Sequence, residues 1–308
     1  MLSERDILGP LRFRSKPGNR GLALGIGDDC AIYRPEHGEE LVFTTDFLIE
    51  DVHFRFRTHT SAQVGHNALA RGLSDIAAMG AMPRFCLLSL ALPPHADHRW
   101  VKGFYRGLLK LADSTGATLA GGDLAHTDRF HCDIVVCGAV PRGTALRRSG
   151  AKPGHAIYVS GALGGSALGL ETGRGAAWRR HLRIEPRLGL GRFLRTRLKA
   201  TACMDLSDGL SLDLERLCLE SGVSAAITMP PIFPKANASQ ALHGGEDYEL
   251  LFTVAASQKV PPEFEGIALT RIGVVEAGKP GRVLLDGRKL KPAGFDHFAG
   301  PVDLHAEI

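Results

Sequence analysis

The sequence predicts a mixed α/β (α+β) protein built from two domains, on three observations. The chain has 308 residues, about twice the ~150 residues of an average domain. Short β-rich runs alternate with longer segments in which apolar residues recur at helical spacing. A polar, glycine-containing stretch at Gly143–Gly154 interrupts that pattern near the middle of the chain. We therefore predict an N-terminal domain over residues 1–145 and a C-terminal domain over residues 146–308.

The elements of the first domain follow from apolar spacing and from the residues that stop each run. In Ser61–Gly80, apolar or small residues recur every three or four positions until glycine ends the predicted helix. A second amphipathic helix is expected at Trp100–Ser114, because Gly116 supplies its end. The predicted strands are Leu41–Asp46, Phe85–Leu92 (closed by two prolines) and Asp133–Val140.

The second domain shows the same alternation with shorter elements. It opens with a predicted strand at Ala156–Ser160, followed by a glycine-rich turn at Gly161–Gly165. Helices are expected at Ser166–Glu171, Arg187–Lys199 and Leu210–Ser221. Further strands are expected at Ala225–Met229, Tyr248–Val254 and Ile272–Glu276.

Composition excludes several classes of protein. Hydrophobic residues make up 44% of the chain and charged residues 23%, which is ordinary for a globular protein and excludes a disordered chain, a collagen or a coiled coil. The formal net charge is +4, too small to indicate nucleic-acid binding. Eight arginines at 174–197 have little aromatic interleaving, so we expect no nucleic-acid partner.

The cysteines and the N-terminus predict a location. The six cysteines form no CxxC pair, which fits neither a disulfide framework nor a zinc site and indicates reduced thiols. The N-terminus has acidic residues and no apolar core of a signal peptide. Apolar runs are shorter than the ~20 residues of a membrane helix. We expect a soluble cytoplasmic protein with no membrane partner.

Aspartates beside glycines or at strand ends are the main chemical feature of the sequence. Each alone is better explained as a turn, because Asp and Gly are common turn residues. Five such motifs, each joined to an apolar segment, favour a shared site. They are GIGDD at Gly25–Asp29, TTD at Thr44–Asp46, GGD at Gly121–Asp123, DLSDG at Asp205–Gly209 and GGED at Gly244–Asp247.

Asp75 sharpens this prediction because it lies inside a predicted helix among apolar neighbours. It either faces solvent, as most helical aspartates do, or points inward and needs a cation or hydrogen-bond donors. The candidate ligands are all oxygen atoms, a donor set that selects Mg²⁺, Mn²⁺ or Ca²⁺ over zinc. Because Mg²⁺ commonly binds phosphates beside one or two carboxylates, the sequence predicts a polyphosphate site.

Other phosphate signals are weak. The chain has no P-loop and no protein-kinase signature. Backbone N–H groups of Gly161–Gly165 could hold a phosphate, and so could the basic turn around Arg148, which is equally well explained as a solvated turn. No serine or cysteine lies in a recognisable nucleophile setting.

Taken in order, these motifs resemble the thiamine-monophosphate kinases, and the resemblance spans nearly the whole chain. The matching segments are GIGDDCA at Gly25–Ala31, TTD at Thr44–Asp46 with His53–Phe54, LSDIAAMG at Leu73–Gly80, GGD at Gly121–Asp123, RSGAKPG at Arg148–Gly154, DLSDGL at Asp205–Leu210, GGEDYEL at Gly244–Leu250 and GFDHF at Gly294–Phe298.

The resemblance implies a fold, a site and partners. The family shares a superfamily with aminoimidazole ribonucleotide synthetase and selenophosphate synthetase, which implies an N-terminal α/β domain that forms a barrel in a homodimer and a C-terminal α/β domain that covers the nucleotide. The implied metal ligands, for several Mg²⁺ ions, are Asp29, Thr44, Thr45, Asp46, Asp75, Asp123, Asp205 and Asp208. The implied nucleotide contacts are Tyr105, Gly122, Asp123, Arg148 and Ser207. The implied substrate contacts are His53, Glu246 and Phe295.

The implied reaction is ATP-dependent phosphorylation of thiamine monophosphate to thiamine diphosphate, the last step in making that cofactor. A phosphate monoester is already ionised near pH 7, since its second pKa is about 6, so no catalytic nucleophile or general base is expected. For His53, a purely structural role stays open. Three other functions stay open: another ATP-using member of the superfamily, a non-catalytic regulator that binds metal and nucleotide, and a Mg²⁺-dependent phosphatase. ADP release that depends on thiamine phosphate distinguishes a kinase from the last two.

Overall fold

The computed structural model describes Ile7, Leu11, residues 21–26 and residues 28–295. The chain divides into two compact units, one formed by Met1–Ile76 with Ala81–Thr144 and the other by Ala77–Gly80 with Ala145–Ile308. In the residues described, no helix combines the length and the apolar character that crossing a membrane requires.

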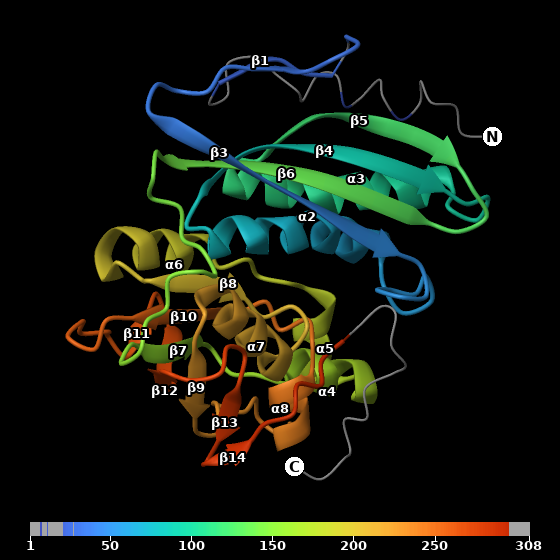
Figure 1. Cartoon of the computed structure of the whole chain (residues 1–308). Helices are drawn as coiled ribbons and strands as arrows, with labels where there is room; N and C mark the ends of the chain where they lie inside the picture. The colour runs from blue at the N-terminus through green and yellow to red at the C-terminus, as the bar shows by residue number, and fades with distance from the viewer. Residues whose placement is uncertain (1–6, 8–10, 12–20, 27, 296–308) are drawn as a thin grey trace. The chain divides into compact units, whose positions relative to one another are not determined.

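The first unit is built on a four-stranded sheet in the order β3-β6-β4-β5. Strands β4 and β5 are parallel and the other pairs are antiparallel. Helices α2 and α3 lie side by side against one face of this sheet, and β1 lies over the other (Figure 1). The elements are β1 (Leu22–Leu24), β2 (Ile32–Tyr33), β3 (Glu39–Ile49), α2 (Ser61–Ala78), β4 (Met82–Leu92), α3 (His98–Thr115), β5 (Thr118–His126) and β6 (His131–Pro141).

The second unit holds an eight-stranded sheet in the order β14-β13-β9-β12-β7-β10-β8, with β11 paired to β12. Only β13 and β9 are parallel among these pairs. The elements are β7 (Ala156–Ser160), α4 (Gly165–Thr172), α5 (Gly175–Leu182), α6 (Leu188–Phe193), a π-helical turn η1 (Leu194–Leu198), β8 (Ala202–Asp205), α7 (Leu210–Ser221), β9 (Ser224–Ile227), α8 (Ala238–His243), β10 (Leu250–Val254), β11 (Glu263–Phe264), β12 (Ile267–Glu276), β13 (Val283–Leu285) and β14 (Arg288–Lys289).

Strand β10 shows how this sheet separates two cores. Its residues are all buried, and successive side chains point to opposite faces. Leu251 belongs to the cluster that includes Leu214 of α7, whereas Phe252 belongs to the cluster that includes Leu194 of η1. A strand buried on both faces lacks polar alternation, which is why its sequence is apolar except for the buried Thr253.

Several expectations need correction. The helix predicted at Arg187–Lys199 is two segments, because η1 widens the turn after α6 and Lys199 ends it in a left-handed conformation (φ 51°). Strand β5 was not predicted, because its two glycines interrupt the β-rich pattern. Gly122 suits the strand because a Cβ there would lie 1.9 Å from the carbonyl oxygen of Leu88. Helix α5 was also missed.

Candidate functional site

On the helix-covered face of the first unit's sheet, two predicted ligands of β3 meet helix α2. The Thr44 hydroxyl donates to Asp75 Oδ2 at 2.5 Å. Arg71 Nε donates to Asp46 Oδ1 at 3.2 Å. Arg71 and Asp75 are four residues apart and so lie on the same side of α2. Asp75 is half-buried and accepts a hydrogen bond from Thr44, and its role as a metal ligand stays a prediction.

Thr45 lies on the opposite face of this sheet, because side chains alternate along a strand. Its hydroxyl donates to Asp133 Oδ1 of β6 at 2.5 Å. Asp133 was not predicted as a site residue, and its sequence context, a β-strand start without a neighbouring glycine, gave no signal. The sheet thus separates the side chain of Thr45 from those of Thr44 and Asp46.

A cavity of about 1230 Å³ brings together four predicted residues of the first unit: Asp29, Tyr105, Gly122 and Asp123. Asp28 and Asp29 line it from the loop after β1, and Gly122 and Asp123 line it from β5. All three aspartates are exposed. Their hydrogen bonds come from backbone N–H groups of Asp29 and Leu124, and within residues 21–26 and 28–295 none of the three forms an ion pair.

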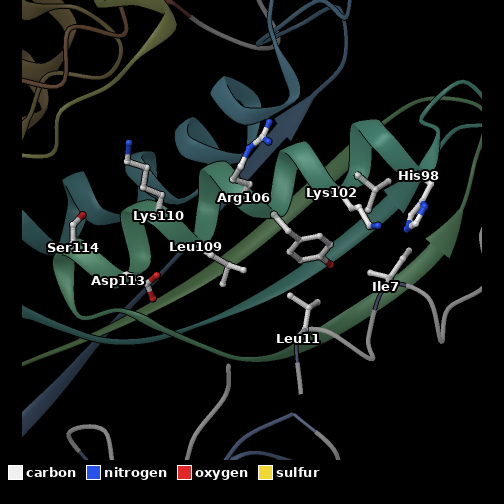
Figure 2. Close-up of a pocket in the computed structure, with 11 residues that line it drawn as sticks. Ile7, Leu11, His98, Lys102, Arg106, Leu109, Lys110, Asp113 and Ser114 are labelled. Atoms are coloured by element: carbon white, nitrogen blue, oxygen red, sulfur yellow. The ribbon is translucent and has the colours of Figure 1, made fainter. Parts of the chain in front are cut away.

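A second cavity of about 730 Å³ runs along α3, where Ile7 and Leu11 face the helix (Figure 2). Lys102 and Arg106 line it and are one helical turn apart. Tyr105 and Leu11 line both cavities. Burial raises the pKa of the Tyr105 phenol, so its hydroxyl stays neutral and able to donate a hydrogen bond.

The donor set of the larger cavity suits a hard cation. Asp28, Asp29, Asp123 and the hydroxyl of Ser89 offer only oxygen, the ligand type of Mg²⁺, which keeps several waters and needs few carboxylates. In the part of the chain that the structure describes, no group of three or more His, Cys, Asp or Glu side chains is close enough to form a ready-made metal cage. The residues fit a Mg²⁺ ion that is held jointly with phosphate oxygens.

In the second unit, Asp205 is the buried last residue of β8, and the loop between β8 and α7 carries Ser207 and Asp208. Asp213 of α7, which the sequence did not single out, holds this loop by accepting from the backbone N–H groups of Asp208 and Gly209 at 3.1 Å each. Burial, followed by the charge of Asp208, raises the pKa of Asp213 to about 7. Arg216 pairs with Asp208 and with Asp213.

Three other residues predicted to contact nucleotide or substrate, Arg148, His53 and Phe295, differ in exposure and in hydrogen bonding. The side chain of Arg148 is exposed, and its carbonyl accepts from the Ser221 hydroxyl at 2.7 Å. His53 Nδ1 accepts from the Ile49 N–H at 3.0 Å, as a structural histidine would. Phe295 is exposed, and its N–H donates to the Asp208 carbonyl at 3.0 Å. The rest of its motif, residues 296–298, lies outside the described residues.

The glycine-rich turn at Gly161–Gly165, a weak phosphate signal in the sequence, is followed by a helix whose first N–H groups bind a carboxylate of this chain. The N–H groups of Gly164 and Ser166 donate to Asp247 at 2.5 and 3.1 Å. Asp247 is one residue beyond the predicted Glu246. The sequence did not reveal that Asp247, Glu249, Arg180 and Arg187 form one buried ionic group, because the partners come from distant segments.

Comparison with known proteins defines first a class and then a family. A model of the "AIR synthase related protein, N-terminal domain" matches residues 27–144. The thiamine-monophosphate kinase of Bacillus subtilis is 36% identical, covering 89% of this chain and 93% of its own. That of Salmonella typhimurium is 37% identical, covering 94% of this chain and 96% of its own.

Solved structures of this family have a fold similar to that of this chain. The thiamine-monophosphate kinase of Stenotrophomonas maltophilia superposes with a TM-score of 0.84 at 36% identity, covering 94% of this chain and 98% of that one. A structure described as AaThiL complexed with AMPPCP and TMP gives 0.78 at 32% identity, covering 86% and 89%. The chain belongs to the thiamine-monophosphate kinase family, and its mixed α/β fold matches the solved members.

Proposed function

We propose that this protein transfers the γ-phosphate of ATP directly to thiamine monophosphate, giving thiamine diphosphate and ADP. A bond forms between an oxygen of the acceptor phosphate and the γ-phosphorus, and the bond between that phosphorus and the oxygen of ADP breaks. Support comes from family membership and from the relative whose complex holds an ATP analogue and TMP. The observation that carries the proposal is the cavity: among the described residues that line it are three aspartates without an ion pair to any described residue, and no histidine, lysine or arginine.

The chemistry of this cavity suits phosphoryl transfer between two anions. The acceptor phosphate is largely ionised near neutral pH, so repulsion between phosphates is the main obstacle. Mg²⁺ bound by Asp29 and Asp123 would neutralise that charge and align the two phosphates. We assign further metal contacts to Thr44, Thr45, Asp46, Asp75, Asp205 and Asp208, as the family resemblance implies.

Nucleotide and substrate contacts complete the proposal. Tyr105 lines both cavities of the first unit. A nucleotide with its phosphates beside Asp123 can therefore extend along α3 toward Lys102 and Arg106. We assign Gly122, Arg148 and Ser207 to the nucleotide, and His53, Glu246 and Phe295 to thiamine phosphate.

The direct test is purified protein with ATP, Mg²⁺ and a panel of phosphate monoesters, with products identified by mass. We expect thiamine diphosphate and stoichiometric ADP only when thiamine phosphate is present. Faster phosphorylation of unphosphorylated thiamine would overturn the substrate assignment. Phosphate released from the monoester without ATP would instead indicate a phosphatase, and a phosphorylated enzyme on the reaction path would exclude direct transfer.

We also propose a homodimer formed by the first unit, in the cytoplasm. Phe43 and Phe47 are 61% and 56% exposed on β3, on the sheet face opposite the helices. An apolar sheet face of this kind needs a cover. Phe43→Asp should convert a dimer into a monomer in light scattering at micromolar concentration, while Leu170→Asp, at another exposed apolar residue, should leave it unchanged. A wild-type monomer would contradict the proposal.

A further inference from the structure

The side chain of Glu246 has a histidine beside it that the sequence did not single out. His181 of α5 is 6% exposed. Its Nδ1 lies 2.9 Å from the Ser166 hydroxyl and 3.5 Å from Glu246 Oε2. Trp178, three residues earlier on α5, stacks on the imidazole with centroids 5.2 Å apart and planes 18° apart. Nδ1 thus lies between the Ser166 hydroxyl and the Glu246 carboxylate, and the stacked ring restricts rotation of the imidazole.

The backbone that carries Glu246 is held from both sides. Glu246 and Tyr248 adopt left-handed conformations, with φ of 62° and 50°, which non-glycine residues keep only where their surroundings enforce them. The Glu246 N–H donates to the Ser207 carbonyl at 2.7 Å, and the Tyr248 N–H donates to the Leu206 carbonyl at 2.9 Å. Asp247 between them accepts from the N-terminus of α4.

Two buried ion pairs anchor the same segment more deeply. Glu249 has a fully buried side chain and accepts from Arg180 Nη2 and Arg187 Nε, both at 2.9 Å, and from the Ser160 hydroxyl at 2.5 Å. Arg180 Nε also lies 3.5 Å from Asp247 Oδ1. These contacts fix the Cα position of Glu246, which leaves the direction of its side chain to be set by its neighbours.

The three acidic residues Glu246, Asp247 and Glu249 have partners of different charge. Asp247 and Glu249 face arginines, whose positive charge cancels theirs. Glu246 faces a histidine whose pKa is lowered by burial against the opposing effect of Glu246, so the ring is neutral near pH 7. A neutral N–H can orient a carboxylate without cancelling its charge. Such a carboxylate attracts a cation, and the thiazolium ring of thiamine phosphate is one.

We propose that His181 is a positioning residue that orients the Glu246 carboxylate toward the cationic ring of the substrate, with Trp178 fixing the plane of the imidazole. This inference rests on the proposed function, in which Glu246 contacts thiamine phosphate. It gives helix α5, through His181 and Trp178, a role in binding the substrate.

The test compares KM values in the full-length protein. His181→Leu removes the N–H but keeps an apolar side chain of similar size in a buried place. We expect it to raise the KM for thiamine phosphate about tenfold, the size of effect that loss of a polar contact to a charged group can have, and to leave the KM for ATP and kcat within about twofold. His181→Asn places an amide N–H near the position of Nδ1 and should restore most of the affinity.

A double-mutant cycle separates positioning from a general structural effect. If His181 acts through Glu246, the variant carrying both His181→Leu and Glu246→Gln should bind thiamine phosphate no more weakly than Glu246→Gln alone. His155→Leu is the matched control, because His155 is also hydrogen-bonded to a hydroxyl, that of Thr201 at 2.8 Å. It should leave both KM values unchanged.

Three outcomes would overturn the inference: an unchanged KM for thiamine phosphate in folded His181→Leu, equal rises in both KM values, or effects that multiply in the double variant. Should His181→Leu not fold, Trp178→Leu frees the imidazole without removing it and should give the same selective rise, about threefold; an unselective rise would contradict the proposal. Failure of the wild-type protein to phosphorylate thiamine phosphate would instead refute the proposed function.

Discussion

Two groups of carboxylates, one in each unit, are arranged in opposite ways. In the first unit, Asp28, Asp29 and Asp123 are exposed in a cavity, and in the described residues none has a cationic partner. In the second unit, Asp247 and Glu249 are buried against Arg180 and Arg187. A buried charge must be paired, since an unpaired one is very costly. The paired group thus supports the fold, whereas the open group is available to a cation that the protein does not itself supply.

The largest effect we expect is on stability, in the paired group. Glu249→Gln leaves Arg180 and Arg187 without their shared carboxylate, because both hydrogen-bond to it. The free energy of unfolding in urea should fall by about 3–5 kcal/mol, the usual effect of breaking a buried ion pair.

The control for that variant is Glu185→Gln in the same unit. Glu185 pairs with Arg183 at 2.7 Å, and both side chains are more than half exposed. Its loss should change the free energy of unfolding by less than about 1 kcal/mol. Equal changes in the two variants would show that burial is not what distinguishes the paired group.

Substitutions in the open group, Asp28, Asp29 and Asp123, should lower catalytic activity. Asp123→Asn removes one charge from the cavity, and we expect turnover to fall about 100-fold or more, because stabilisation of phosphate charge is the main catalytic contribution proposed. The free energy of unfolding should stay within about 1 kcal/mol, since Asp123 forms no ion pair with any of the described residues. Asp128→Asn, at an exposed turn residue between β5 and β6, should leave both quantities unchanged. Normal turnover in Asp123→Asn would remove this residue from the site.

The pH dependence of the free energy of unfolding reveals the contribution of Asp247. Burial raises its pKa from 3.8 to about 6, against the opposing effects of Arg180 and of two backbone N–H groups. An acid whose pKa is higher in the folded state stabilises that state at low pH. Its contribution is present below about pH 3.8 and is lost as the pH rises through 6.

Relative to Asp247→Asn, the wild-type protein should therefore lose on the order of 2–3 kcal/mol of unfolding free energy between pH 4 and pH 7. The comparison is clean because Glu249, whose pKa shifts downward, is present in both proteins. A difference that does not vary with pH would contradict the assignment.

Much of the fold could be predicted, because strands such as Phe85–Leu92 and helices such as Ser61–Gly80 have strong apolar periodicity. Observed β4 and α2 include nearly all of these residues. Strand β5 could not, since what makes Gly121–Gly122 suitable is the close approach of β4, a tertiary contact. Short helix α5 lacks a clear capping signal: no side chain caps its N-terminus.

The candidate site was predictable in part for the same reason. Aspartates beside glycines indicated the cavity that holds Asp29 and Asp123, because motif and site coincide in a few adjacent residues. The partners of Asp247 and Glu249 could not be read from the sequence. Arg180 and Asp247 are 67 residues apart, and only folding brings them together. The roles of the predicted ligands stay predictions.

The contrast between open and paired carboxylates is tested most directly by cation binding without nucleotide. Mn²⁺, which substitutes for Mg²⁺ at oxygen sites, can be counted by electron paramagnetic resonance on wild-type protein, on Asp29→Asn with Asp123→Asn, and on Asp247→Asn. We expect the double variant to bind Mn²⁺ at least tenfold more weakly than wild type, and Asp247→Asn to bind it as wild type does. Undiminished Mn²⁺ binding by the double variant would contradict the account.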